Sequence, residues 1–192
     1  MSHFFAYLAR MKFIQRWGLM RNTDPENIME HSLQVAQVAH ALAVINNRYR
    51  GGCVSPERTA TLALYHDASE VITGDLATPI KYFNPQIKTA YREIEVVAKS
   101  KLLAMLPDAL KGEYAALLTP DGEDQEAWAL VRAADKICAY LKCLEEQRAG
   151  NGEFAQAEKA IKAELDRTAT PEVRFFLERF VPSFSLTLDE LN

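Results

Sequence analysis

The chain has 192 residues, 48% of them hydrophobic and 25% charged, as is usual for a globular protein, and we expect one domain over residues 1–192. A formal net charge of −4 without a basic run argues against nonspecific nucleic-acid binding as its main task. The three cysteines lack C-x-x-C spacing, and neither a signal peptide nor an apolar run of ~18 residues is present. We therefore predict a cytoplasmic protein with reduced thiols and no membrane contact.

The first predicted element is a short amphipathic helix over residues 3–14. An irregular stretch follows at residues 15–22 and contains Arg16 and Trp17. Loops that are not uniformly polar often carry function. A surface arginine beside a core tryptophan would give the same sequence, so both interpretations stay open.

A long helix is predicted from Asn27 to about Tyr49. Asn27 and Glu30 have the spacing of a capping pair, which places His31 about one turn inside the helix. His40 falls on the outer face, whereas His31 shares the inner face with Val35, Val38, Leu42 and Ile45. His31 is therefore either a satisfied core histidine or a ligand.

Ser55 as N-cap and Pro56 in the first turn predict a second helix, which we expect to continue to Gly74. Residues 62–71 of this helix, LALYHDASEV, are apolar on nearly every side, which predicts burial. The following residues, 73–79, form a turn-rich loop, whose polar side chains could simply bond the local backbone.

The same buried stretch carries three ionisable side chains, His66, Asp67 and Glu70. Burying such groups is costly unless they are paired or bind a metal. Glu70 neighbours both of the others at helical spacing. His66 and Asp67 are adjacent and so point apart on a regular helix. They could share one metal only through a bent approach or a distorted helix segment.

The remainder of the chain is predicted helical, with segments at 86–106, 107–118, 123–149, 153–167 and 171–180 and a short C-terminal piece at 185–191. In the first segment we expect these residues to face inward: Ile94, Val97, Leu102, Met105 and Leu106. The helix at 123–149 has a firm apolar stripe, and Asp135 lies at its edge, either solvated or reaching into a cleft. With no convincing strand, the class is all-α.

His31, His66, Asp67 and Asp135 offer two imidazoles and two carboxylates. This set suits a divalent ion such as Mn, Fe, Co, Ni or Zn better than Ca or Mg. The lack of a cysteine ligand argues against a closed structural zinc site. Four ligands on a six-coordinate ion would leave positions for water and a substrate oxygen, as metal-assisted hydrolysis requires. A lone His-Asp pair would be a weak signal.

This pattern resembles the HD-domain superfamily of helical metal-dependent phosphohydrolases. Nearly the whole chain is similar to the bacterial 5′-deoxynucleotidases of the YfbR type. The segments that carry the resemblance are Arg16-Trp17 and residues 30–36, 65–71, 73–76, 79–83, 138–146 and 180–184. Two departures are Ala77, where we expect proline, and Met29, where we expect a small polar residue.

The resemblance implies a single-domain HD-domain helical bundle. Its activity would be the hydrolysis of deoxyribonucleoside 5′-monophosphates to deoxyribonucleosides and phosphate, with selection against ribonucleotides. One divalent ion (Co, Mn, Zn, Fe, Ni or Cu) would be bound by His31, His66, Asp67 and Asp135.

The resemblance also assigns roles in substrate binding and catalysis. Arg16 would orient the phosphate, and Trp17 would pack on the sugar and disfavour a 2′-hydroxyl. Glu70 would be the catalytic acid/base, and its apolar surroundings predict a raised pKa. The remaining substrate-binding residues would be His31, Asp75, Leu76, Ala77 and Thr78.

Two other functions stay open on the sequence. One is an HD-domain phosphodiesterase or nucleotide pyrophosphohydrolase, and the other is a non-catalytic helical module with a structural or lost metal site. A purely structural site has no use for Glu70 or Arg16. Exposed aromatic side chains near the C-terminus, at Phe175, Phe176 and Phe184, would allow a homodimer.

Overall fold

Helices form all the regular elements of this computed structural model, which describes residues 1–81 and 83–191. The α-helices are α1 (Phe4–Leu8), α2 (Ile28–Arg50), α3 (Pro56–Tyr65), α4 (Glu70–Thr73), α5 (Thr78–Lys81), α6 (Pro85–Ala104), α7 (Asp108–Leu118), α8 (Gln125–Arg148), α9 (Ala155–Thr168) and α10 (Pro171–Arg179). The 3₁₀ helices are η1 (Ala9–Phe13), η2 (Gly152–Phe154), η3 (Val181–Ser185) and η4 (Leu188–Leu191). The all-α prediction is confirmed for these ranges. Tyr82, in one of the segments noted above, lies outside the described residues.

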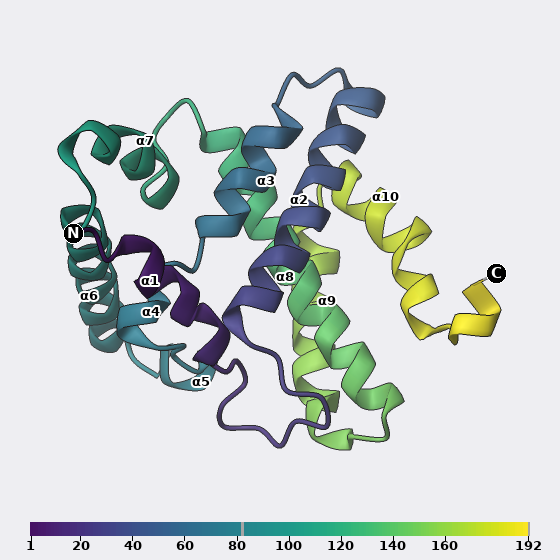
Figure 1. The fold of residues 1–192 in the computed structure, drawn as a ribbon. Helices are drawn as coiled ribbons and strands as arrows, with labels where there is room; N and C mark the ends of the chain where they lie inside the picture. The colour runs from purple at the N-terminus through teal and green to yellow at the C-terminus, as the bar shows by residue number, and fades with distance from the viewer. Residues whose placement is uncertain (82, 192) are drawn as a thin grey trace.

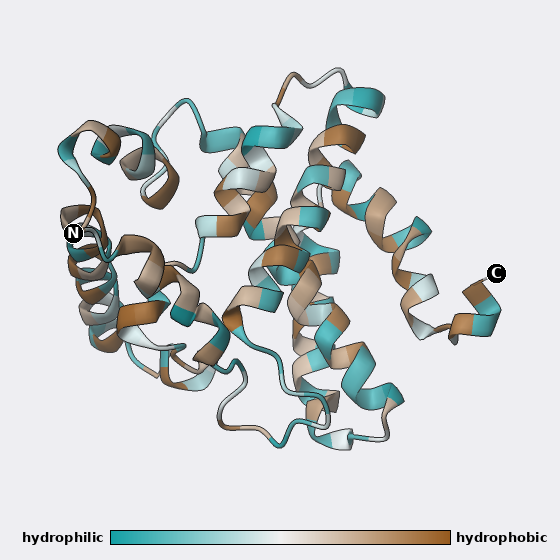
Figure 2. Cartoon of the chain, viewed as in Figure 1, coloured by the Kyte–Doolittle hydropathy of each residue, from teal (hydrophilic) through white to brown (hydrophobic). Residues whose placement is uncertain are grey.

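The centre of the molecule is built from α2, α3 and α8, which pack against one another (Figure 1). The apolar faces predicted for α2 and α8 are both buried there, including Leu42 and Leu141. Hydrophobic segments run along these helices, whereas the C-terminal end of α8 is mostly hydrophilic (Figure 2). The end of α8 is therefore the part of the central layer where polar contacts are expected.

The predicted N-caps are present. The side chain of Asn27 accepts hydrogen bonds from the backbone N–H groups of Met29 (3.0 Å) and Glu30 (3.1 Å), and Glu30 completes the capping box. Ser55 accepts from the N–H of Arg58 at 3.0 Å and starts α3. These caps satisfy backbone donors that have no partner within the helix, and they fix where α2 and α3 begin.

The N-terminal segment packs on a smaller core beside α6 and α7. The predicted helix over residues 3–14 is divided into α1 and η1. Phe4 is buried and meets Tyr114 edge-on, with ring centroids 5.0 Å apart. The inward positions predicted for Ile94 and Val97 are wrong, because both side chains are exposed. α6 lies at the edge of the bundle (Figure 1) and buries only a narrow stripe, so its other apolar residues meet solvent.

The helix predicted to run on to Gly74 is interrupted. α3 ends at Tyr65, residues 66–69 form turns, and α4 begins at Glu70. At the break, the N–H of His66 donates to the carbonyl oxygen three residues back, Ala63 O (3.4 Å), instead of four residues back as in a regular α-helix. The ring Nδ1 of His66 lies 2.7 Å from the same oxygen. Leu64 is exposed, so one side of this apolar stretch faces solvent and is not buried as predicted. Because residues 66–69 are not helical, the adjacent side chains of His66 and Asp67 need not point apart as they would on a regular helix.

The C-terminal aromatic residues do not form the exposed surface that was expected. Phe176 is buried, and Phe175 and Phe184 pack partly buried against the main core. Tyr49 stacks on Phe175 with ring centroids 4.9 Å apart, which explains why the Phe175 side chain is partly buried. The three side chains are less exposed than predicted, whereas Phe180 between them is exposed, and the homodimer stays a prediction. No helix of the described residues is long and apolar enough to cross a bilayer.

Leu42 and Leu33 lie on the same helix and differ in burial, at 0% and 55% exposure. Leu42→Ala removes packed methyl groups from the main core, so we expect it to lower the free energy of unfolding by about 2–5 kcal/mol. Leu33→Ala is the matched control and should change it by less than about 0.5 kcal/mol. Urea unfolding followed by circular dichroism measures both. Equal losses would contradict the burial described here.

Candidate active site

Four predicted ligands come together from three parts of the chain. His31 lies in the first turn of α2, His66 and Asp67 lie in the turn between α3 and α4, and Asp135 lies midway along α8. His31 Nε2 is 3.0 Å from Asp135 Oδ1 and 3.9 Å from Asp67 Oδ2. His66 Nε2 is 3.0 Å from Asp67 Oδ2. The break after α3 allows His66 and Asp67 to face the same point.

The chemistry of these side chains fits a metal ion. Single ligand atoms of His31, His66 and Asp67 all lie within 4.8 Å of one another, and Asp135 joins the group through His31. His66 Nε2 is buried without a hydrogen-bond partner, although Asp67 is close. Its Nδ1 can donate to Ala63 O, which leaves Nε2 with a lone pair directed at the cluster. Buried charges of this kind are stabilised by a shared cation.

Glu26 links the cluster to Arg16. Its carboxylate accepts a hydrogen bond from Arg16 Nε at 2.9 Å and lies 3.5 Å from His31 Nδ1. Arg16 Nη1 is 3.5 Å from Asp67 Oδ2. Burial alone would lower the pKa of Arg16, but the charges of Asp67 and Glu26 outweigh it and raise the pKa. Arg16 is thus a fixed cation beside the cluster.

Glu26 was not predicted, because its position just before a helix cap has an ordinary explanation in the sequence. The signal that would have found it is the ligand His31 itself. A ligating histidine usually needs an acceptor for its second ring nitrogen. Glu26 is the carboxylate nearest that nitrogen among the ion pairs of the described residues.

Glu70 starts α4 and is almost fully buried. Its Oε2 is buried without a hydrogen-bond partner. Burial, followed by the negative charge of Asp67, raises the pKa of Glu70 to about 10. The raised pKa predicted from its apolar surroundings is therefore found. In the metal-free protein this carboxyl is neutral near pH 7, so it can act as a proton donor.

Trp17 has a backbone conformation that bulky residues rarely adopt, with φ of 58°. It is alone in this among the non-glycine residues that the structure describes. Its ring packs on Phe154 at a centroid distance of 5.3 Å, and its Nε1 is buried without a partner. A strained residue next to charged groups is typical of functional sites. The strained backbone of Trp17 is consistent with the functional interpretation of this residue.

Several of these groups, among them Arg16, Asp67 and Glu70, line a cavity of about 810 Å³. One wall is formed by Arg16 and Trp17, and another by Asp75, Leu76, Ala77 and Thr78, as the sequence predicted. Asp67, Glu70 and Asp135 lie along it, and the 42% exposed part of the Asp135 side chain accounts for its place there. The volume is sufficient for a small ligand such as a nucleotide.

The rest of the cavity lining was not predicted. It includes residues of α9 and polar side chains of α5 and α8: Lys81, Lys136, Ala157, Ala160, Ile161, Glu164 and Arg167. In α9, Ala157, Ala160 and Ile161 have the helical spacing that is ordinary for a core-facing helix, so a cavity wall could not be predicted there.

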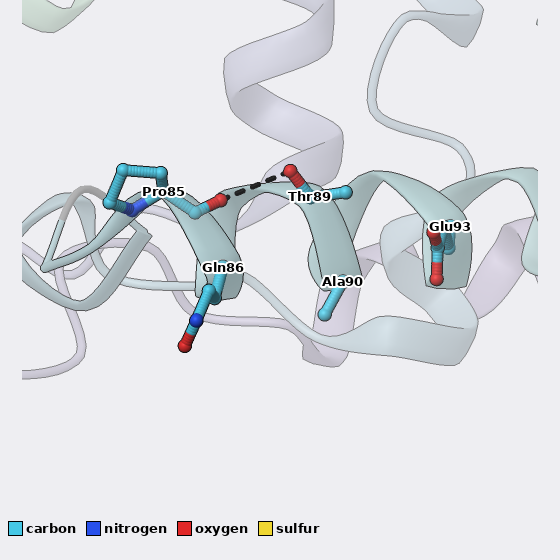
Figure 3. A pocket seen from close by; sticks show the side chains of 5 residues that line it. All are labelled: Pro85, Gln86, Thr89, Ala90 and Glu93. Atoms are coloured by element: carbon cyan, nitrogen blue, oxygen red, sulfur yellow. Dashed lines mark hydrogen bonds between the residues drawn. The ribbon is translucent and has the colours of Figure 1, made fainter.

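A second hollow lies along the surface of α6 (Figure 3). Its side chains are Pro85, Gln86, Thr89, Ala90 and Glu93, and Thr89 Oγ1 donates to Pro85 O at 3.1 Å. Glu93 is its one ionisable side chain, whereas the larger cavity holds several. The chemistry of the chain therefore belongs to the larger cavity.

Residues 3–184 match a family profile described as 5′-deoxynucleotidase YfbR-like. The chain belongs to this YfbR-like family. It is 58% identical over 191 residues to a 5′-deoxynucleotidase of Vibrio cholerae and 57% identical over 192 residues to one of Yersinia pestis. Both matches cover 100% of the chain and 98% of the relative. The predicted family is confirmed.

Solved structures place the YfbR-like chain in the HD-domain fold. An HD-domain phosphohydrolase from Listeria innocua has a TM-score of 0.81 at 22% identity, with 95% of this chain and 88% of that one covered. The cyanophage S-2L HD phosphohydrolase, bound to dA and one catalytic Zn²⁺, has a TM-score of 0.67 at 20% identity, with 93% and 96% covered. The predicted HD-domain bundle is confirmed.

Glu70 should make the metal-free protein less stable as the pH rises. Its pKa increases from an ordinary 4.5 to about 10 on folding, so between these values the folded state holds more protons than the unfolded state. Glu70→Gln removes this titration. Relative to wild type, the variant should gain about 4 kcal/mol in free energy of unfolding between about pH 5 and about pH 8. Urea unfolding in a chelator measures the gain, and the same difference at both pH values would contradict the raised pKa.

Proposed function

We propose that this chain is a 5′-deoxynucleotidase, a phosphomonoester hydrolase that converts deoxyribonucleoside 5′-monophosphates to deoxyribonucleosides and phosphate. Its family and its full-length relatives support this activity. The observation that carries the proposal is that the two carboxylates of the ligand cluster, a fixed arginine and a neutral carboxyl line one cavity. These are the groups that a slow phosphate-monoester hydrolysis requires.

The metal ligands in this proposal are His31, His66, Asp67 and Asp135. They hold one divalent ion from the set Co, Mn, Zn, Fe, Ni and Cu, which the ligand types do not narrow further. When bound, the ion stabilises negative charge on the phosphoryl oxygens and supplies an activated water. The catalytic Zn²⁺ of the cyanophage structure supports a divalent metal at this fold's site.

Arg16 orients the phosphate. Glu26 holds its guanidinium through Nε, and Asp67 lies beside Nη1, so the planar group faces the cavity with its position fixed. A guanidinium matches the spacing of two phosphate oxygens, which lysine does not reproduce. A phosphate held by Arg16 would lie in the cavity that Asp67, Asp135 and Glu70 also line, which brings it within reach of the ligand cluster and the acid/base.

Glu70 is the acid/base. Its carboxyl is neutral in the metal-free protein, and a nearby cation brings its pKa down toward the working range. In the proton-donor step, the oxygen of a water bonds to phosphorus as the ester phosphorus–oxygen bond breaks, and the Glu70 carboxyl gives its proton to the 5′-oxygen of the leaving deoxynucleoside, so that phosphate and the deoxyribonucleoside are the products. This transfer avoids an alkoxide leaving group in a buried site.

Trp17 selects the sugar. Its ring stands at the cavity wall, where it packs on the deoxyribose and excludes a 2′-hydroxyl. The adjoining residues Asp75, Leu76, Ala77 and Thr78, which line the same cavity, bind sugar and base. His31 would contribute to substrate binding through its place in the ligand cluster. Burial raises the pKa of Asp75, and the charge of Arg16 opposes this shift. The cytoplasmic location and the homodimer stay predictions that accompany this proposal.

Phosphate release from matched substrates tests the activity. Chelated protein, resupplied with single metals, should hydrolyse dAMP and leave dATP and cyclic dinucleotides intact. Chelation should abolish the activity, and Glu70→Gln should lower kcat by about 10²–10⁴-fold while metal binding is kept. Preferred hydrolysis of dATP or a cyclic dinucleotide would instead indicate a pyrophosphohydrolase or a phosphodiesterase.

Trp17→Ala tests the origin of sugar selectivity. If the indole excludes the 2′-hydroxyl, the variant should hydrolyse AMP better relative to dAMP, by about 10-fold or more in the ratio of kcat/KM values. Leu19→Ala, which changes an exposed neighbour at the same cavity, is the control and should keep the wild-type ratio. A Trp17→Ala variant that still strongly prefers dAMP would refute this role.

A further inference from the structure

An ion pair is buried near the C-terminal end of α8. Lys142 and Glu146 are 4% and 1% exposed, and the ammonium of Lys142 hydrogen-bonds the Glu146 carboxylate one turn on. Burying an ion pair rarely stabilises a fold more than apolar packing would. The two residues lie in a segment, 138–146, whose role in the site is still unassigned. We call the pair the α8 clasp.

The α8 clasp binds the loop that carries Arg16 and Trp17. The Glu146 carboxylate accepts hydrogen bonds from the backbone N–H groups of Thr23 at 2.9 Å and Asp24 at 3.1 Å. Lys142 Nζ donates to the carbonyl oxygen of Asp24. These bonds attach the tip of the loop to α8, and the loop passes the lower end of that helix (Figure 1).

Asn151 completes the attachment. Its Nδ2 donates both to Glu146 Oε2 and to the carbonyl oxygen of Arg21, each at 2.7 Å. The base of the loop is closed separately by the bridge between Gln15 and Asn27. The loop is therefore fixed at its two ends and at its tip. The tip is the part that the buried charges of α8 hold.

The α8 clasp also reaches Trp17 through Phe154. Lys142 Nζ lies 5.6 Å from the centre of the fully buried Phe154 ring, and the Trp17 ring packs on the same ring at 5.3 Å. Trp17 is held with φ of 58°. A strained backbone of this kind persists only where the surroundings over-determine it. The α8 clasp and Phe154 are such surroundings.

We propose that the α8 clasp is the positioning element for sugar selectivity, because it holds the Arg16–Trp17 loop so that the Trp17 ring closes the cavity against a 2′-hydroxyl. Lys142 and Glu146 touch no substrate and act through the loop. This inference rests on the proposed deoxynucleotidase function. It predicts that loosening the clasp changes selectivity more than stability.

Glu146→Gln is the substitution that tests the α8 clasp most directly. All partners of the carboxylate are donors, namely Lys142, Thr23, Asp24 and Asn151. The NH₂ of a glutamine would face one of them, so the loop attachment must shift. Glu172→Gln is the matched control. Glu172 is also buried and paired, with Arg50 Nη1 at 2.9 Å, but it joins α10 to α2 and lines no part of the cavity.

The kinetic test compares the dAMP and AMP kcat/KM values of the two variants with those of wild type at full metal loading. Glu146→Gln should lower the dAMP/AMP ratio about 10-fold, since small displacements of a positioning group have large kinetic effects. Glu172→Gln should leave the ratio within about twofold while losing comparable thermal stability. An unchanged ratio in folded Glu146→Gln would overturn the proposal. If that variant fails to fold, Asn151→Ala takes its place and should lower the ratio about threefold.

A fluorescence readout separates this inference from the proposed function. In a Trp128→Phe background, Trp17 is the sole tryptophan, and acrylamide quenching reports its exposure. Glu146→Gln should raise the quenching constant about twofold and Glu172→Gln should not. If wild type does not distinguish dAMP from AMP, the proposed selectivity fails, and quenching alone then decides whether the clasp positions Trp17. Equal quenching in both variants would overturn it.

Discussion

The structure depends on one electrostatic constraint, which is that buried and partly buried ionisable side chains of both signs lie around a single point. His31, His66, Asp67 and Asp135 are within reach of one another, and Arg16 and Glu70 border them. Desolvation on this scale is tolerated only when the charges compensate. The compensation is arranged so that a cation completes it and a phosphate can approach from the cavity.

Much of the fold could be read from the sequence, because periodicity and caps are local signals. The inner face of α2, its capping box and the stripe of α8 all follow from spacing alone. The misplaced residues of α6 show the limit of this approach. An apolar residue at helical spacing is buried only if another element covers it, and Ile94 and Val97 have too little cover at the edge of the bundle.

The residues of the candidate site also divide into those predicted from the sequence and those whose place depends on distant contacts. Ligands and Glu70 were predictable because ionisable residues in an apolar stretch conflict with their setting, and the resemblance supplied Arg16 and Trp17. Three features were not predictable, namely Glu26, the α9 wall and the α8 clasp. Each looks ordinary in the sequence, because the contacts that matter are made with residues more than 100 positions away or across a loop. The break after Tyr65 was missed because residues 62–71 have strong helical spacing, and the bonds that stop the helix involve a side chain.

The cavity draws its walls from Arg16 near one end of the chain to Arg167 near the other. A ligand held there is bound by a surface that exists only when the whole chain has folded. Binding free energy is therefore added to folding free energy, because the unfolded chain has no comparable site. Metal supply thus becomes a determinant of how long each molecule survives proteolysis, apart from how fast it turns over substrate.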